Sequence, residues 1–416
     1  MPQQKRSHTA RPSPADSHLL RAGIARVDVT PTRPVTLAGY GSRKDVSRGV
    51  HDRLSARAVA FERDGRRLVL VSTDNLGFYG GTAARYREAI LAACGLAPSE
   101  LFLSAIHTHS APDLAGAGRT GHRHNIAYVR ALESDLVGVV RKTLARLAPV
   151  RVGVGVGSCP VGVNRRETVT DAAGKSRITL GRNPAVSTDR QVQVLKVSRA
   201  DTGALAAVLF AYATHSTSLG PGNYLVSGDV HGLAEQFVEN RLGAGVIAPA
   251  FAGASGDLDP WFRVRPGFDT RRGWVPEPIL LGTMLGEEVV HVLDGIDAPR
   301  APGPIRTAFE ILRLPAKKRG KSAEFSLSVG RAGDVAFVGL GGEVFNEIGR
   351  EIKAASPFPL TVVITHCNGA AGYLPTAPSY PYGGYEVETS AFGPAAAREV
   401  VRAAVTMLRQ IQRDAD

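Results

Sequence analysis

The sequence predicts an α/β fold in which large mixed β-sheets are faced by helices. Short, nearly all-apolar runs end at polar residues, as Leu68–Thr73 ends at Asp74, and such runs are typical of buried strands. Segments with apolar residues three and four positions apart lie between these runs and are typical of amphipathic helices. The chain has 416 residues, 44% of them hydrophobic, and is therefore long enough to bury a sizeable core.

Two kinds of strand are expected. Alternation of apolar and polar residues in Val150–Val156 and Val192–Val197 predicts half-buried antiparallel strands. Because ligands bind beyond the carboxyl ends of strands in α/β sheets, the polar residues after the apolar runs are candidates for one shared site. Besides Leu68–Thr73, the predicted buried strands are Leu101–Ile106, Ala206–Thr214, Gly245–Ala252, Val335–Leu340 and Leu360–Thr365.

The clearest helical pattern is Ile126–Leu147, and Gly95 is the expected stop of a helix over Thr82–Cys94. We predict one catalytic domain that spans residues 21–416 and a disordered leader that spans residues 1–20. The other predicted helices are Gly232–Leu242, Pro278–Leu293, Val344–Ala355 and Pro394–Gln412, and the predicted loops are Gly116–His124, Arg263–Trp274 and Pro315–Ser322.

The composition indicates which molecules and which cellular compartment to expect for this protein. A net charge of +12 comes with scattered arginines and only 6% aromatic residues, so we expect no nucleic-acid partner and instead a positive field that attracts an anionic small molecule. The three cysteines lie far apart without a Cys-x-x-Cys motif, which favours a reducing, cytoplasmic location. No apolar run is long enough to predict a transmembrane segment, and no pattern indicates an oligomeric state.

The polar residues after the strands include metal-ligand types. His107 and His109 are two positions apart at a strand end, so their side chains are expected on the same side, although paired histidines also occur as ordinary core or surface residues. His215 and Glu343 follow two other apolar runs. Imidazoles and a carboxylate from different strands are ligands that zinc prefers.

Several segments, read together, resemble the neutral/alkaline ceramidase family. They occur in the same order as in that family over nearly the whole chain, which is more specific than any single motif. The segments are Ala22–Pro31, Leu37–Tyr40, Gly49–Asp52, His107–Pro112, Val163–Arg165, Val226–Asp229, Gly256–Pro260 and Gly342–Val344.

The resemblance implies the layered catalytic fold of neutral ceramidases and one bound Zn²⁺. By position, the zinc ligands it implies are His107, His215, Glu343 and Tyr373. The residues it implies to face the substrate are His109, Arg165 and Tyr385.

The chain also departs from the family. Asp259 stands where ceramidases have the serine of Gly-Asp-x-Ser-Pro that is tied to amide cleavage. A carboxylate does not act as an acyl-accepting serine, but Asp259 or Asp257 is suited to take a proton from a zinc-bound water as general base. The sequence ends soon after Pro394–Gln412, so we expect the C-terminal immunoglobulin-like domain of full ceramidases to be absent.

These residues predict a zinc-dependent hydrolase that cleaves an amide (N-acyl) bond of a small molecule. In it, His109 and Tyr385 stabilise the oxyanion, and Arg165 instead anchors an acidic substituent of the substrate. Two alternatives stay open: an esterase, lactonase, acyl-transferring or cyclising enzyme of specialised metabolism, and a non-catalytic ligand-binding relative. As alternatives to these roles, Asp257 is a turn residue before Pro260, and Tyr373 and Tyr385 are members of a packing aromatic patch.

Overall fold

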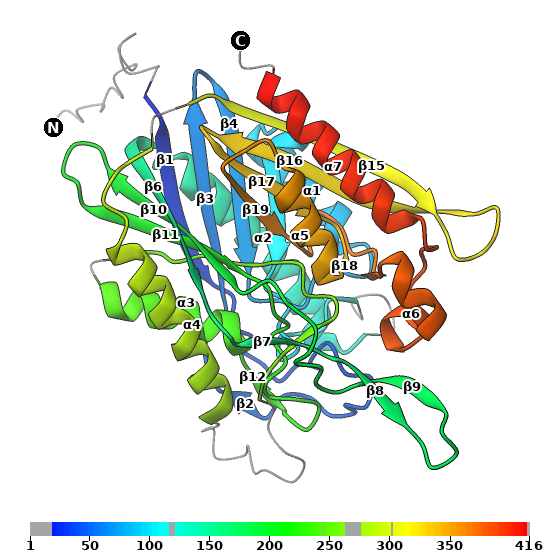
Figure 1. The fold of residues 1–416 in the computed structure, drawn as a ribbon. Coiled ribbons are helices and arrows are strands. Elements are labelled where there is room, and N and C mark those ends of the chain that lie inside the picture. The colour runs from blue at the N-terminus through cyan, green and yellow to red at the C-terminus, as the bar shows by residue number, and fades with distance from the viewer. Residues whose placement is uncertain (1–18, 116–120, 244, 263–275, 301–302, 414–416) are drawn as a thin grey trace, which may run out of the picture.

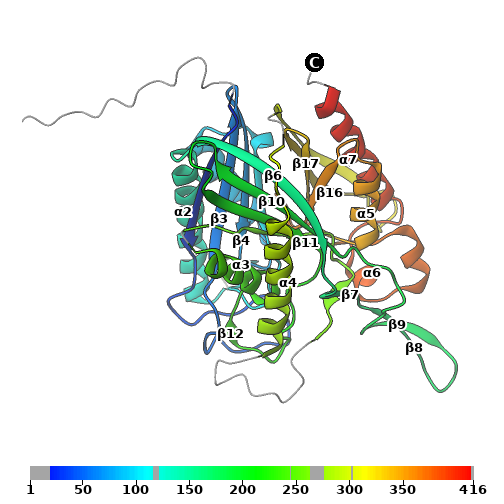
Figure 2. The same ribbon diagram turned by 60° about the vertical axis from the view of Figure 1, so that its left-hand side comes forward.

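Two β-sheets pack face to face, and helices cover the outer face of each (Figures 1 and 2). The computed structural model describes residues 19–115, 121–243, 245–262, 276–300 and 303–413. The larger sheet has the strand order β13 (Ala250–Ala252), β11 (Leu205–Tyr212), β10 (Gln191–Arg199), β6 (Ala148–Ser158), β1 (Arg21–Asp28), β3 (Ser55–Arg63), β4 (Arg66–Thr73) and β5 (Leu101–Ala105). The smaller sheet has the order β15 (Ile305–Pro315), β16 (Ser322–Ala332), β17 (Val335–Leu340) and β19 (Leu360–Ile364).

The central strands are buried on both faces because their side chains serve two different cores. In β3, Ala58 and Ala60 face a helix-covered core, whereas Val59 and Phe61 face the core between the sheets. Phe337 of β17 reaches the same inter-sheet core from the smaller sheet. Successive residues of a strand point to opposite faces, so an all-apolar run is what this layered packing requires.

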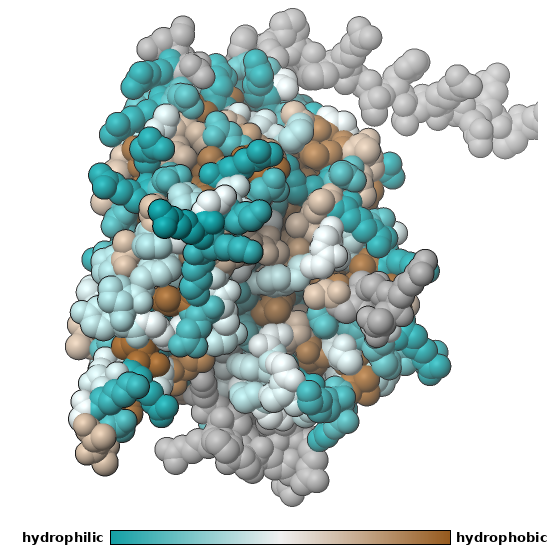
Figure 3. Space-filling view, turned by 90° about the vertical axis from the view of Figure 1, so that its right-hand side faces the viewer, coloured by the Kyte–Doolittle hydropathy of each residue, from teal (hydrophilic) through white to brown (hydrophobic). Residues whose placement is uncertain are grey.

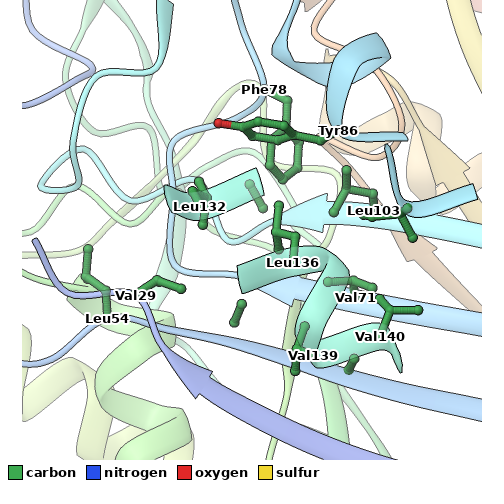
Figure 4. Packing of buried hydrophobic residues seen from close by; sticks show 14 of the residues in the cluster. Val29, Leu54, Val71, Phe78, Tyr86, Leu103, Leu132, Leu136, Val139 and Val140 are labelled. Carbon is green, nitrogen blue, oxygen red and sulfur yellow. The ribbon is translucent and has the colours of Figure 1, made fainter. Parts of the chain in front are cut away.

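Two pairs of helices cover the outer face of the larger sheet, and one pair covers that of the smaller sheet. Helices α1 (Thr82–Cys94) and α2 (Arg123–Leu144) cover the half of the larger sheet that contains β1 and β3, and Figure 4 shows Leu136 and Val140 of α2 packed close to Val71 and Leu103. The other half is covered by α3 (Asp229–Leu242) and α4 (Pro276–Asp294), and the smaller sheet by α5 (Asn346–Ala355) and α7 (Ala396–Arg413).

Short strand pairs lie outside the two large sheets; three of them connect loops that are distant in sequence, and the fourth, β8–β9, is a hairpin. Residues near the predicted site belong to two of them, β7–β14 and β18–β20. The pairs are β2 (Gly49–Val50) with β12 (Leu225–Val226), β7 (Gly162–Asn164) with β14 (Leu258–Pro260), β18 (Glu343–Val344) with β20 (Tyr373–Leu374), and β8 (Arg166–Thr170) with β9 (Ser176–Leu180). The remaining elements are the 3-10 helices η2 (Pro98–Glu100) and η4 (Ala377–Tyr382) and the short helix α6 (Tyr385–Thr389).

The predicted α/β architecture with mixed sheets is confirmed. The larger sheet is mixed because β4–β5 and β11–β13 are parallel while its other pairs are antiparallel. The strand expected over Gly245–Ala252 is wrong in extent, because only Ala250–Ala252 forms a strand after Pro249, which lacks an N–H for the ladder. The helix expected from Val344 begins instead at Asn346, because Val344 belongs to β18.

Three predictions fall partly or wholly on residues that the structure does not describe. These are the leader, of which residues 1–18 lie outside the described part, and the loops predicted over Gly116–His124 and Arg263–Trp274. Among the described residues, no helix is both long and apolar enough to cross a membrane. On the face that Figure 3 shows, hydrophobic residues lie in separate groups between hydrophilic ones.

Candidate metal centre

The two predicted histidine ligands are brought together by backbone contacts between strand ends. His107 follows β5 and has φ of 61°, a left-handed conformation that is uncommon for residues other than glycine. His215 follows β11, and a bridge between Thr108 and Ser216 joins the two segments. The N–H of His109 donates to the carbonyl of Ser216 at 3.1 Å. The His107–His109 segment is therefore fixed beside His215.

Glu343 and Tyr373 are direct partners in the parallel pair β18–β20. The N–H of Glu343 donates to the carbonyl of Gly372 at 2.8 Å, which holds the two short strands in register. Oε2 of Glu343 lies 3.3 Å from Nε2 of His107 and 3.6 Å from Nε2 of His215. The histidines and the carboxylate that sequence analysis selected thus meet at one place.

Hydrogen bonds assign the tautomers of both histidines. Nδ1 of His107 lies 2.6 Å from the carbonyl of Leu76, and Nδ1 of His215 lies 2.8 Å from the carbonyl of Ser255. A carbonyl oxygen only accepts, so each Nδ1 carries the proton and each neutral ring has its lone pair on Nε2. A carbonyl partner on one ring nitrogen and a lone pair on the other is the usual arrangement of a metal-ligating histidine.

Burial keeps the imidazoles of His215 and His109 neutral. Burial, and then the nearby Arg165 and His107, lower the pKa of His215 to about 3. The pKa of His109 is also well below its ordinary value, because of burial and then the neighbouring His107 and His215. Neutral nitrogen donors and an ionised carboxylate are what a divalent cation requires.

The surroundings of the Glu343 carboxylate also fit a bound metal ion. Within the described chain, Oε2 of Glu343 accepts no hydrogen bond although it is buried among imidazole nitrogens. Ligand atoms of His107, His109 and His215 all lie within 4.8 Å of one another. His109, expected from the resemblance to face the substrate, therefore also borders the centre, with its Nε2 3.3 Å from that of His107. These residues are able to hold a metal ion.

Arg165 is bound by protein groups on several sides. Its Nε donates to Glu386 at 2.8 Å, its Nη2 to the hydroxyl of Tyr373 at 3.1 Å, and its Nη1 lies 3.3 Å from both Asp259 Oδ1 and His215 Nε2. These contacts fix the guanidinium between the predicted ligands and the predicted base. That Arg165 anchors an acidic substituent of the substrate remains a prediction.

The two predicted aspartates have different surroundings. Asp259 is fully buried in β14, and its carboxylate lies 3.3 Å from both Arg165 and Thr217. Asp257 accepts hydrogen bonds from the side chain of Asn164 at 2.9 Å and from the N–H of Asn346 at 2.7 Å. Burial raises the pKa of Asp257 to about 6. Asp257 thus joins β7 to the first turn of α5.

The predicted tyrosines lie at different depths. Tyr373 is buried, and burial followed by the charge of Glu343 raises its pKa well above its ordinary value. Tyr385 is 48% exposed, and its ring centroid lies 5.6 Å from that of Tyr373, so it borders the outer side of the site. The nearby Tyr380 donates to the carbonyl of Phe392 at 2.7 Å and has a packing role.

Sequence analysis assigned no role to three residues that touch this site. The hydroxyl of Tyr79 donates to Oε1 of Glu343 at 2.8 Å. The ring of His366 stacks on that of His107, with centroids 3.8 Å apart and an angle of 11° between the planes. Glu386, fully buried, binds both Arg165 and Arg166. His366 and Glu386 carried a signal, since one follows a predicted strand and the other follows Tyr385, but Tyr79 stands in no recognisable motif.

Comparison with known proteins identifies relatives of this fold. The chain is 28% identical to the neutral ceramidase of Pseudomonas aeruginosa over 272 residues, which is 62% of this chain and 39% of the relative. It is 26% identical to neutral ceramidase 2 of Arabidopsis thaliana over 230 residues, which is 52% of this chain and 30% of the relative. The matches thus span less than half of the length of these relatives.

A crystal structure of the Pseudomonas aeruginosa neutral ceramidase has the same fold, with a TM-score of 0.78 and 20% identity over 96% of this chain and 75% of that one. The family model described as neutral/alkaline non-lysosomal ceramidase, N-terminal, matches residues 20–260, which is more than half of the chain. The protein therefore belongs to the neutral/alkaline non-lysosomal ceramidase family, as its sequence motifs predict.

Proposed function

We propose that this protein is a zinc-dependent hydrolase that cleaves the amide (N-acyl) bond of a small molecule. The observation that carries the proposal is the convergence of His107 Nε2, His215 Nε2 and Glu343 Oε2 at 3.3–3.6 Å. The choice of an amide rests on family membership, since the relatives are named neutral ceramidases. A small molecule, rather than ceramide itself, is favoured by Asp259 at the position of the family's serine.

Zinc is the proposed metal because its ligands in proteins are imidazole nitrogens and carboxylate oxygens. His107, His215 and Glu343 would hold it, with the phenol of Tyr373 as the fourth protein ligand. When bound, zinc supplies a Lewis acid and lowers the pKa of a coordinated water toward about 7.

The protein groups around this centre supply the remaining chemistry. The carboxylate of Asp259 accepts a proton from the attacking water, and Arg165 and Thr217 hold that carboxylate in place at 3.3 Å. Neutral His109 and the hydroxyl of Tyr385 donate hydrogen bonds to the oxyanion that forms as the amide carbonyl is attacked. Arg165 connects Asp259 to Tyr373 and so keeps base and ligand at a fixed separation.

We also propose a cytoplasmic location. Cys94, Cys159 and Cys367 are all free thiols in the structure. Free thiols persist where the compartment is reducing. Locating the tagged protein by fractionation of its native host cell tests this, and recovery outside the cytoplasm would overturn it.

Metal analysis tests the function. Protein purified without a histidine tag is expected to contain about one zinc ion per chain, and His107→Ala and His215→Ala are expected to lose it. The matched control is His291→Ala, because His291 is exposed on α4. A full zinc complement in the His107 and His215 variants would refute their assignment as ligands.

Activity of the zinc-loaded protein is then measured on matched N-acyl amides, esters and lactones. Hydrolysis of the amides is expected to exceed that of the esters. The reverse preference would favour an esterase or lactonase, and bound zinc without turnover of any of them would favour a ligand-binding relative.

A further inference from the structure

Arg182 lies beside the proposed base but is held differently from the other arginines near the site. It follows strand β9 of the β8–β9 hairpin, which Figure 1 shows close to α6. Its Nε donates to the carbonyl of Trp261 at 3.2 Å, and its Nη1 to the carbonyl of its neighbour Gly181 at 2.6 Å. Nη1 also lies 3.6 Å from Oδ2 of Asp259. The guanidinium is thus fixed in place next to Asp259.

Arg165 and Arg166 have their charges satisfied by the protein. Glu386 accepts from both of them, at 2.8 and 2.7 Å, and Arg166 also donates to the carbonyl of Gly383. Their side chains are only 5% and 10% exposed, whereas that of Arg182 is 25% exposed. Of the three arginines, Arg182 is therefore the one most accessible to a ligand.

Arg182 shares its nearest carboxylate with another arginine. Asp259 is shared with Arg165, which approaches its other oxygen at 3.3 Å. Glu167 accepts from the backbone N–H of Arg182 and makes no ion pair with the guanidinium. Within the described part of the chain, Nη2 of Arg182 donates no hydrogen bond to protein. Burial, and then repulsion from Arg165, lower the pKa of Arg182, whereas the charge of Glu167 raises it.

We propose that Arg182 binds a carboxylate of the substrate, so that the substrate is an N-acyl amino acid or a similar N-acylated carboxylate. The inference rests on the proposed amide hydrolase and adds the class of substrate. A chain of contacts leads from His215 through Arg165 and Asp259 to Arg182, at successive distances of 3.3, 3.3 and 3.6 Å. A substrate carboxylate bound to Arg182 would thus lie next to Asp259, the proposed base. Such a carboxylate would be separated by a few bonds from the amide that is cleaved.

The planar guanidinium fork suits this ligand, because two parallel N–H groups match the two oxygens of a carboxylate. The net charge of +12 favours approach of an anion over long distances. From the sequence, Arg165 was expected to anchor an acidic substituent of the substrate. Arg182 is better placed for this role, because Arg165 is held by protein groups on several sides.

Equilibrium binding tests the proposal without turnover. The probes are N-(hexylsulfonyl)glycine and its primary amide, which have nearly the same shape, resist hydrolysis and differ in one negative charge. Titration calorimetry with the zinc-loaded wild-type protein is expected to give about tenfold tighter binding of the acid, the effect of one charge-assisted hydrogen-bonded contact at a partly exposed site. Arg182→Gln is expected to bind the two probes equally.

The matched control is Arg177→Gln, because Arg177 is an exposed arginine on the same hairpin and its loss changes the net charge equally. This variant is expected to keep the preference for the acid. Equal binding of the two probes by the wild type, no binding of the acid, or an unchanged preference in Arg182→Gln would each overturn the proposal. Zinc content and hydrolysis of N-hexanoyl amides, measured separately, report whether the proposed function itself fails.

Discussion

The hydroxyl of Tyr79 donates a 2.8 Å hydrogen bond to Oε1 of Glu343, which leaves Oε2 on the side of the histidines. Tyr79 remains a donor because burial, and then the charge of Glu343, raise its pKa well above the ordinary value. The carboxylate is thereby oriented to offer one oxygen to a metal.

Tyr79→Phe should therefore weaken zinc binding by about 10- to 100-fold, the usual cost of losing a hydrogen-bond partner of a metal ligand. Competition with a chelator of known affinity measures this. Tyr382→Phe serves as the control, because Tyr382 is 72% exposed. If the two variants bind zinc equally well, the hydroxyl of Tyr79 does not orient Glu343.

Asp259→Asn should keep zinc but slow turnover by about 100-fold or more, because an amide has no basicity with which to accept a proton. The amide is nearly the same size as the carboxylate and still accepts from Arg165 and Thr217, so the local packing should persist. Measuring kcat and zinc content on the same preparation separates loss of the base from loss of the metal. Unchanged turnover would remove Asp259 from the mechanism.

Much of the site could be predicted because strand ends carry a local signal. His107, His215 and Glu343 each follow an apolar run that forms a strand in one of the two large sheets, and the order of motifs placed Tyr373 with them. Tyr79 could not be found in this way. It meets Glu343 only through tertiary contact, and a lone tyrosine in a loop resembles any other.

Long strands with mixed composition escaped prediction for a related reason. Strands β1 and β3 contain arginines, among them Arg57, which is fully buried and held by Glu235 and Glu239. An ion pair with partners far away in sequence makes such a residue acceptable in a core. Hydrophobic periodicity alone does not detect this compensation.

Acid should destabilise the metal-free protein. Burial lowers the pKa of His215 to about 3 and that of His231 to about 4, below the ordinary value of 6.5. Between pH 6.5 and 4 the unfolded chain therefore binds more protons at these residues, and the free energy of unfolding decreases as the pH falls through this window. From pH 6.5 to 5 the loss is about 2 kcal/mol for each histidine.

Asp257, whose folded-state pKa is raised to about 6, acts in the opposite direction, as do Asp229 and Glu235, whose pKa values burial also raises. His109 and His366 act in the same direction as the two histidines, because burial lowers their pKa values well below the ordinary value. Urea unfolding at pH 6.5 and 5 measures the net change. In His231→Gln, the glutamine amide can still donate to the carbonyl of Tyr212. The free energy of unfolding of this variant should therefore decrease less than that of the wild type, by about the 2 kcal/mol expected for one histidine. An equal decrease in the variant and the wild type would show that His231 is already protonated in the folded state.

Glu386→Gln should both destabilise the fold and disturb the site, because Glu386 is the buried anion between Arg165 and Arg166. Removing one partner of a buried ion pair typically costs about 3–5 kcal/mol, since the remaining charges stay buried without compensation. Denaturant unfolding measures the loss. Glu388→Gln provides the comparison, because Glu388 is exposed on the same short helix, and it should change stability by no more than about 0.5 kcal/mol. If Glu386→Gln were as stable as Glu388→Gln, Glu386 would not be what holds the guanidinium of Arg165 beside Asp259.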